Sequence, residues 1–299
     1  MILTRLTDVE PRPRRVAVGT FDGVHRGHRE VIRGADTVVT FDPHPRTVIA
    51  PEGIPRLLTP MARKAELIGA LGVDELVVID FDARFAARSA QDFHDDVLVA
   101  RLGATHVSVG ENFHYGARAQ GNTALLESDG RFAVRVAPLL EVDGEIVSSS
   151  HIRGLVAGGA VEYAGELLGA PFSMAGEVVH GEARGRALGY PTANLVPQAA
   201  FAKPAHGVYA CRVQLPGGGA AIAAATSIGV RPQFETGLGE LVEAFLIDWS
   251  GDLYGQVIRV DFLKRLRGEK RFASVDALLE QMARDVEDAR GLASLPGRQ

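Results

Sequence analysis

The chain of 299 residues contains a single cysteine, Cys211, so it can form neither an intramolecular disulfide nor a cluster of metal-binding thiolates. One isolated cysteine suits a reducing compartment, and we interpret it as a small core residue in preference to a nucleophile. No apolar run approaches the roughly 18 residues needed to cross a bilayer. The first residues, MILTRLTDVEPRPRR, also lack the apolar middle segment of a signal peptide. We therefore expect a cytoplasmic protein with no membrane partner.

Positive charge and aromatic side chains are scarce as well. The formal net charge is −5, with 32 Lys and Arg against 37 Asp and Glu, and aromatic residues make up 6%. Such a chain has no general basic field to hold nucleic acid through counterion release. It also has few rings on which single-stranded bases could stack. We expect no nucleic-acid partner, and any anionic ligand must be held by local groups.

The remaining composition is that of a folded protein, with 46% hydrophobic and 23% charged residues and a length that predicts about two domains. In the first half, short β-branched runs alternate with helix-like segments, which is typical of an α/β domain with a parallel sheet. Helix starts are expected at a Thr59 cap and at a Ser89–Asp92 capping box. The expected strands are 15–19, 37–41, 75–81, 105–110 and 132–137.

After a connector around Gly158 and Gly159 and a helix over 161–168, the pattern changes. Strand-like segments then follow one another with Gly and Pro turns between them, which indicates an antiparallel barrel or sandwich. A last helix, capped by Ser274, has an apolar side that we expect to pack on those strands. We place the boundary between domains 1–169 and 170–299. The expected strands are 173–180, 208–215, 220–227, 241–249 and 256–263.

Two histidines follow the first strand of this pattern, in the segment GTFDGVHRGH from Gly19 to His28. Backbone N–H groups and the dipole at a helix start favour an anion, and Gly27 allows a ligand to approach the backbone. Phosphate is the natural candidate, since imidazoles can donate hydrogen bonds to its oxygens. A metal site at His25 and His28, or a pair of surface histidines, are the alternatives that these residues leave open.

Two further features mark the second half. The segment from Gly176 to Asn194 is rich in Gly and Arg and can cradle phosphates through its backbone, although barrels also use Gly at corners. Glu243 lies in LVEAFLI, where both strand faces are apolar, and a carboxylate there is costly unless it is paired or functional. It is therefore either a general base or the partner of an arginine such as Arg231 or Arg259.

These segments together resemble one family. GTFDGVHRGH, TFDPHP at 40–45 and GENF at 110–113 resemble, in this order, the HxGH nucleotidyltransferase signature of bacterial bifunctional riboflavin kinase/FAD synthetases, and SSSHIR at 148–153 is similar to that family's SSTxIR segment. The Gly176–Asn194 segment resembles the riboflavin kinase signature, and EAFLIDWSGDLYG resembles the segment with the family's catalytic glutamate. The resemblance implies a Rossmann-like nucleotidyltransferase domain followed by an antiparallel β-barrel riboflavin kinase domain with a terminal helix.

The resemblance also implies roles for individual residues. In the first domain, His25 and His28 would contact the ATP phosphates with Arg153, and in the second Glu243 would be the catalytic base. Thr192 and Asn194 would bind Mg²⁺ and the phosphates. The other residues implied in ATP or flavin binding are Gly19, Phe21, Asp22, Gly27, Phe41, Asn112, Ser149, Ser150, Gly181, Gly185 and Arg186.

The implied function is the conversion of riboflavin to FMN and of FMN to FAD, with ATP as substrate and release of pyrophosphate in the second step. The stretch Arg29–Val39 is shorter than the corresponding crossover in relatives. One alternative is therefore a riboflavin kinase with a weak or inactive adenylyltransferase domain. A second is a regulator that binds flavin or nucleotide without catalysis. The sequence predicts no oligomeric state.

Overall fold

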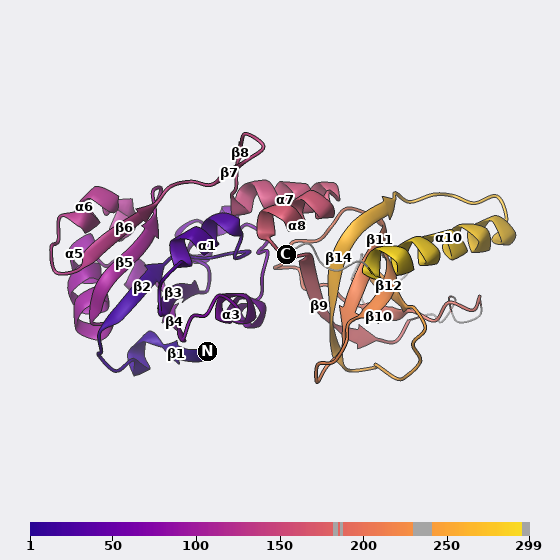
Figure 1. The fold of residues 1–299 in the computed structure, drawn as a ribbon, viewed down its shortest axis with the longest axis horizontal. Coiled ribbons are helices and arrows are strands. Elements are labelled where there is room, and N and C mark those ends of the chain that lie inside the picture. Colours follow the sequence, from indigo (N-terminus) through magenta and orange to yellow (C-terminus); the bar gives the residue numbers. More distant parts are fainter. Residues whose placement is uncertain (182–184, 186–187, 230–240, 295–299) are drawn as a thin grey trace. The chain divides into compact units, whose positions relative to one another are not determined.

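The computed structural model describes residues 1–181, 185, 188–229 and 241–294. It divides into two compact units, Met1–Ser149 and Ser150–Gln299 (Figure 1). This division falls before the helices α7 and α8, so both group with the second unit. The predicted boundary after Gly169, which separates two activities, stays a prediction. Among the described residues, no helix has the length and apolar character needed to cross a membrane.

The first unit contains a six-stranded sheet in the order β1-β4-β3-β2-β5-β6, and every pair of neighbours is parallel. All five predicted strands are confirmed. The edge strand β1, which pairs Ile2 with Glu75 of β4, was not predicted, because four exposed or half-buried residues give no clear period. The strands are β1 (Ile2–Arg5), β2 (Arg14–Val18), β3 (Thr37–Asp42), β4 (Glu75–Asp80), β5 (Ala104–Gly110) and β6 (Ala133–Ala137).

The strand order reverses at β2. From β2 the chain adds β3 and β4 on one side, and it then returns to add β5 and β6 on the other. In open α/β sheets, ligands bind beyond the carboxyl ends of the strands at such a reversal. The loops after β2, β3 and β5 therefore meet at the edge where a binding site is expected.

Helices cover both faces of this sheet. Val16 and Val18 of β2 belong to a core that includes Val97 and Leu98, while Ala17 belongs to a second core with Ile32. Because alternate residues of one strand point to opposite faces, a strand buried on both sides reads as continuously apolar. The main helical segments are α1 (Arg26–Ile32), α2 (Pro45–Ile49), α3 (Met61–Gly69), α4 (Ala83–Ala86), α5 (Ala90–Asp92), the π-helix η3 (Phe93–Arg101) and α6 (Thr123–Glu127).

One predicted helix start is confirmed and one is wrong. Ser89 Oγ accepts the Asp92 N–H and the Asp92 carboxylate accepts the Ser89 N–H, both at 3.0 Å, as the capping box predicts. Helix α3 instead starts after Pro60, and Thr59 does not cap it. Thr59 Oγ1 accepts the N–H of Gly23 at 3.0 Å, so a tertiary contact replaces the local cap.

The second unit is a closed antiparallel barrel of six strands in the order β10-β13-β12-β11-β14-β9. All five predicted strands are confirmed within a few residues, and the short β10 was not predicted. Helices α7 (Ser149–Gly158) and α8 (Val161–Leu168) precede the barrel. Its strands are β9 (Phe172–Val179), β10 (Ala193–Leu195), β11 (Gly207–Gln214), β12 (Ile222–Gly229), β13 (Leu241–Leu246) and β14 (Val257–Arg267).

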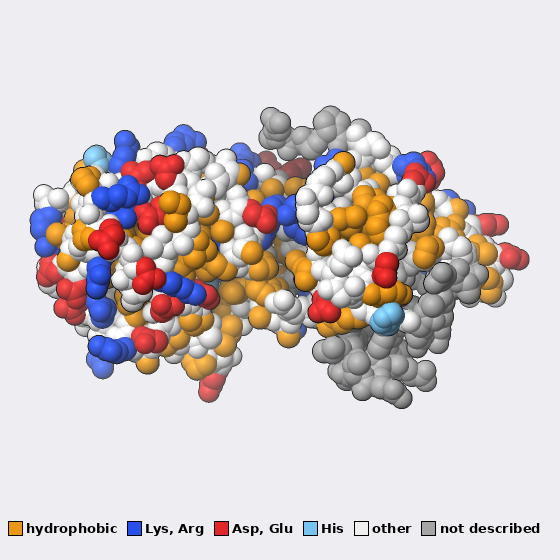
Figure 2. Space-filling model, turned by 90° about the horizontal axis from the view of Figure 1, so that it is seen from below, with side chains coloured by type: hydrophobic (Ala, Val, Ile, Leu, Met, Phe, Trp, Pro, Cys, Tyr) orange, Lys and Arg blue, Asp and Glu red, His pale blue; other side chains and the backbone are white. Residues whose placement is uncertain are grey.

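Helix α10 (Val275–Ser294) packs on the outside of this barrel. Ser274 Oγ accepts the Ala277 N–H at 3.2 Å, which confirms the predicted cap, and Ala289 is fully buried against Ala210 and Ile247. The helix runs through Gly291 to Ser294. Acidic and basic side chains are interspersed on the face drawn in Figure 2.

Candidate active sites

The turn after β2 is shaped by two buried residues. Phe21 has a positive φ of 48°, and its ring lies so close to Gly19 that a Cβ there would come within 3.0 Å of it. Asp22 Oδ1 accepts the N–H groups of Leu58 at 2.9 Å and Thr59 at 3.2 Å. Both of these predicted binding residues therefore hold the turn in place.

The two histidines of this turn lie against each other. His25 is the N-cap of α1, its Nδ1 accepts the His28 N–H at 3.2 Å, and the two rings stack with centroids 3.5 Å apart. Phe21 packs against this pair, and the planes of its ring and the His28 ring make an angle of 86°. The structure therefore brings His25 and His28 together at the carboxyl end of β2.

His28 lies close to a second imidazole and to a lysine. Burial, with the nearby His25 and Lys64, lowers the pKa of His28 well below its usual value, so its imidazole is neutral at pH 7. Its Nδ1 is buried and has no hydrogen-bond partner. In the part of the chain that the structure describes, no group of three or more His, Cys, Asp or Glu is placed to hold a metal ion.

The neighbouring strand ends supply the other predicted residues of this unit. Phe41, at the end of β3, packs edge-on against Phe81 with centroids 5.6 Å apart. Asn112 is exposed just after β5, close enough to Gly110 that a Cβ there would meet its Oδ1 at 3.3 Å. Ser149 donates to the carbonyl of Asp22 at 2.8 Å. These residues thus gather at the strand ends around the histidine turn.

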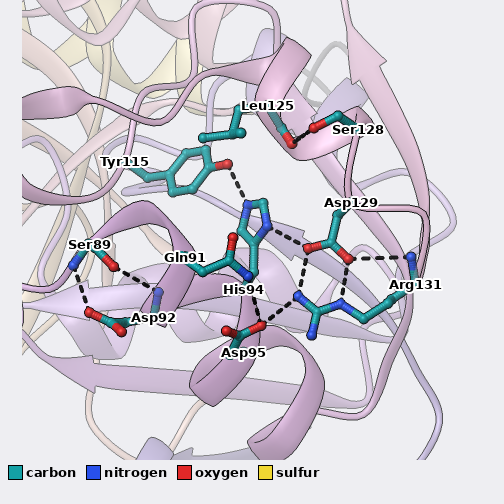
Figure 3. Close-up of polar contacts among 10 residues, drawn as sticks. All are labelled: Ser89, Gln91, Asp92, His94, Asp95, Tyr115, Leu125, Ser128, Asp129 and Arg131. Atoms are coloured by element: carbon teal, nitrogen blue, oxygen red, sulfur yellow. Dashed lines mark hydrogen bonds and ion pairs between the residues drawn. The ribbon is translucent and has the colours of Figure 1, made fainter.

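A buried polar network anchors the loop that carries Asn112 (Figure 3). Tyr115 OH lies 2.5 Å from His94 Nε2, and His94 Nδ1 lies 2.6 Å from Asp129 Oδ2. An ionised Asp129 can only accept, so His94 donates from Nδ1. The hydrogen bonds of Arg131 and His94 hold the pKa of Asp129 far below its usual value, while burial and the charge of Asp129 raise the pKa of Tyr115 to about 12. The network ties this loop to η3.

Two predicted residues of the first site lie in α7, which belongs to the second unit. Arg153 donates from NH1 to Ser150 Oγ at 3.2 Å. Ser150 is exposed, one turn before Arg153 on the same helix. Their predicted roles toward ATP stay predictions.

The barrel brings the second set of predicted residues together at one place. In the register of β10, β12 and β13, Glu243 lies directly across from Asn194 on one side and Ser227 on the other. Glu243 is half-buried, and Asn194 is 6% exposed. Thr192 immediately precedes β10. A carboxylate and an amide therefore lie side by side at the start of β13.

Two glycines close tightly over these side chains. A Cβ on Gly181 would lie 2.3 Å from Asn194 Nδ2, and a Cβ on Gly185 would lie 2.3 Å from the Tyr190 carbonyl and 3.7 Å from Thr192 Oγ1. The oxygens of Thr192 and Asn194 are hard ligands of the kind that Mg²⁺ prefers. The glycines leave room beside them that any side chain would fill, so the donor set and the cradle fit a magnesium–phosphate group.

Two arginines of the sequence analysis lie outside the described residues. They are Arg186, a predicted binding residue, and Arg231, a possible partner of Glu243. The third, Arg259, donates to Asp261 at 3.1 Å on β14, a strand that pairs with β9 and β11.

Comparison with known proteins tests the alternative functions that the sequence left open. A family model for FAD synthetase matches residues 8–151, and one for riboflavin kinase matches residues 168–293. The bifunctional riboflavin kinase/FMN adenylyltransferase of Escherichia coli K12 is 38% identical over 288 aligned residues, which cover 92% of this chain and 91% of the relative. The chain belongs to the bifunctional riboflavin kinase/FMN adenylyltransferase family.

Other members of this family agree with that assignment, and one solved structure shares the fold. The enzyme of the same name from Pseudomonas fluorescens is 38% identical and that from Bacillus subtilis 34%, with at least 90% of each relative covered. A crystal structure from Streptococcus pneumoniae, described as a macrolide-efflux protein, matches with a TM-score of 0.85 and 32% identity, over 97% of this chain and 99% of the other. The likeness to it spans both units of the bifunctional fold.

One candidate residue of this bifunctional chain was missed from the sequence. Lys64 in α3 is 6% exposed, and its Nζ donates to the carbonyl of Thr20 at 2.7 Å, inside the histidine turn. The available signal was its position: it is the single lysine of the first 149 residues, on a short amphipathic helix. By contrast, Cys211 is fully buried in β11, as expected of a core residue, and burial raises the pKa of its thiol.

Proposed function

We propose that this chain makes FAD from riboflavin in two ATP-dependent steps, with residues 1–169 as the FMN adenylyltransferase domain and residues 170–299 as the riboflavin kinase domain. The observation that carries the proposal is the assembly of both predicted residue sets at separate places, His25 with His28 after β2 and Glu243 with Asn194 in the barrel. Members of the family depend on ATP and generally use a divalent metal.

In the kinase step, Glu243 accepts the proton of the riboflavin 5′-hydroxyl as that oxygen attacks the γ-phosphorus of ATP, the bond from this phosphorus to the bridging oxygen breaks, and ADP leaves. Its place across from Asn194 puts the base next to the group that orients the phosphates. Thr192 Oγ1 and the Asn194 amide oxygen would hold Mg²⁺, which supplies charge neutralisation for the phosphates when bound. Positioning and neutralisation account for most of the rate in phosphoryl transfer.

In the adenylylation step, the FMN phosphate attacks the α-phosphorus of ATP and pyrophosphate leaves. His28, neutral at pH 7, donates a hydrogen bond to a phosphate oxygen. Ser149, which donates to the Asp22 carbonyl, contributes a further donor to the nucleotide. The aromatic cluster at Phe41 offers an apolar surface for the flavin ring. No covalent enzyme intermediate is needed.

We further propose that the partners are small molecules only, namely riboflavin, FMN and ATP, and that the protein works in the cytoplasm. The chain carries 37 Asp and Glu against 32 Lys and Arg. Its anionic substrates are therefore met by local His, Arg, Lys and backbone donors within each unit.

The deciding measurement incubates the purified chain with riboflavin, ATP and Mg²⁺ and separates the flavins by chromatography. We expect FMN followed by FAD. FMN alone would favour a riboflavin kinase with an inactive first domain, and the absence of both products would favour the non-catalytic regulator.

The first prediction concerns Glu243→Gln. This variant keeps the shape of the side chain but removes the base, so FMN formation should fall by about 10² to 10⁴. FAD synthesis from supplied FMN should be unchanged, because Glu243 belongs to the barrel. Loss of both activities would refute the assignment of one activity to each domain.

A further inference from the structure

The first unit contains a buried lysine that no motif of the family resemblance includes. Lys64 Nζ donates to the Thr20 carbonyl at 2.7 Å and lies 3.4 Å from Thr40 Oγ1, which itself donates to the same carbonyl at 3.0 Å. Thr20 follows Gly19 in the histidine turn, and Thr40 lies near the end of β3. Lys64 therefore joins α3 to the carboxyl ends of the two strands that flank the site.

The described hydrogen bonds of this lysine go to a carbonyl and a hydroxyl and not to a carboxylate. Both of its hydrogen-bond acceptors are uncharged, and the carboxylates of Asp22 and Asp42 act on it through space. A buried ammonium is costly unless an anion balances it. Burial accordingly lowers the pKa of Lys64 to about 8, against the opposing effect of the two carboxylates.

Several titratable groups on the surrounding elements face Lys64 and interact with its positive charge. From the β2 turn and α1 they are Asp22 and His28, on which His25 stacks, and from β3 Asp42. Asp22 Oδ1 already accepts the backbone N–H groups of Leu58 and Thr59. His28 is neutral and feels the charge of Lys64 directly. The histidine site thus contains the ammonium group of Lys64 in addition to the imidazoles of His25 and His28.

We propose that Lys64 is a positioning residue of the adenylylation site, which fixes the Gly19–Asp22 turn through the Thr20 carbonyl and supplies the buried positive charge that the ATP phosphates balance. This inference rests on the proposed adenylyl transfer. It adds that the reaction requires Lys64 in its protonated form. An arginine would stay charged at every pH, whereas a buried lysine titrates, so binding of the anion and protonation of Lys64 favour each other.

The sign of the pH effect follows from this coupling. Lys64 is cationic below its pKa of about 8 and loses its proton as the pH rises through that value. The kcat/KM for ATP in adenylylation reports the free enzyme, so it should fall as the pH rises above about 8. Titration of His28 cannot explain this limb, because its pKa lies well below its usual value.

The test compares Lys64→Met with Arg63→Met in the full-length chain. Arg63 is the next residue on the same helix, paired at 2.8 Å with Glu66, so its removal deletes an equal charge outside the site. We expect Lys64→Met to lower kcat/KM for ATP in adenylylation at pH 7 by about tenfold or more, and to abolish the decline above pH 8 in the activity that remains. Arg63→Met should keep both the wild-type rate and its decline.

Three controls separate the possible failures. Riboflavin phosphorylation and the thermal midpoint, measured on each variant, show whether Lys64→Met has kept its fold. Absence of FAD formation in the wild-type chain would refute the proposed function itself. A wild-type chain that makes FAD, with a Lys64→Met rate within twofold of Arg63→Met or an unchanged alkaline decline, would overturn the role of Lys64.

Discussion

Two glycines of the barrel lie where a single methyl group would disturb the candidate kinase site. Gly181 packs on the side chain of Asn194, and Gly185 packs on the Tyr190 carbonyl beside Thr192. Neither has a left-handed φ, so the space around each, and not its backbone conformation, requires glycine. Sequence reasoning placed both in a phosphate loop, but it could not say what they touch.

The second prediction follows from that contact. Gly181→Ala would place a Cβ 2.3 Å from Asn194 Nδ2, so the amide must move away from its position across from Glu243. We expect riboflavin phosphorylation to fall by at least tenfold, while FMN adenylylation continues at its wild-type rate. Gly291→Ala on α10, where a Cβ meets nothing within 4 Å, is the matched control. Equal kinase rates in the two variants would contradict the tight contact.

At the scale of elements, η3 shows how a loop is held at the strand ends. Its local pattern predicted a helix after the Ser89 capping box, and a helix forms, but with π geometry over Phe93–Arg101. π segments are rare and often occur at functional sites. Here the segment carries His94, which bonds Tyr115 in the Asn112 loop. The contact between His94 and Tyr115 joins residues that are distant in the sequence.

The third prediction concerns the carboxylate of this network. The folded pKa of Asp129 is depressed by Arg131 and His94, so its stabilising effect is full above the unfolded value near 4 and is lost as the pH falls below it. Asp129→Asn should lower the free energy of unfolding at pH 7 by about 2 kcal/mol, and should flatten the decline in acid. Urea denaturation at pH 7 and at pH 3 measures both effects.

A matched variant isolates the buried contact from the loss of charge. Asp95→Asn removes the exposed carboxylate that pairs with the same Arg131 at 2.6 Å. It should change stability little, because exposed ion pairs are screened by water. If the two variants were equally destabilised, or if Asp129→Asn kept the wild-type acid dependence, the network would not anchor the loop as described.

At the scale of the whole molecule, the histidine turn lies in the first unit and Glu243 with Asn194 in the second, and this arrangement predicts separable activities. His28→Ala should remove a phosphate donor and lower FAD synthesis from FMN, while riboflavin phosphorylation stays at the wild-type rate. Flavin chromatography on each substrate measures both. A large fall in the kinase rate would contradict the division of the chain into two catalytic domains.

The fifth prediction combines the two single-site variants. His28→Ala supplies FMN and Glu243→Gln supplies adenylylation, so an equimolar mixture should make FAD from riboflavin although neither variant does so at an appreciable rate alone. FMN released to solvent by one chain is then used by the other. Absence of FAD from the mixture, with both single activities intact, would contradict exchange of FMN through solvent.

The sequence by itself determined the class of each half, the order of most strands and the identity of most candidate residues. Periodicity is local, and the segments GTFDGVHRGH and EAFLIDWSGDLYG are contiguous, so neither needs a folded chain to be recognised. The resemblance also predicted a barrel where the residues alone allowed a barrel or a sandwich. The short strands β1 and β10 gave too few residues for a period.

Only the tertiary structure decided which side chains meet. It placed Asn194 across from Glu243 through strand register, drew Thr59 from its helix cap to the histidine turn, and buried Lys64 under that turn. These contacts join residues about 35 to 50 positions apart. Local propensity carries no information on such pairs, because their geometry depends on how strands and helices pack around one core.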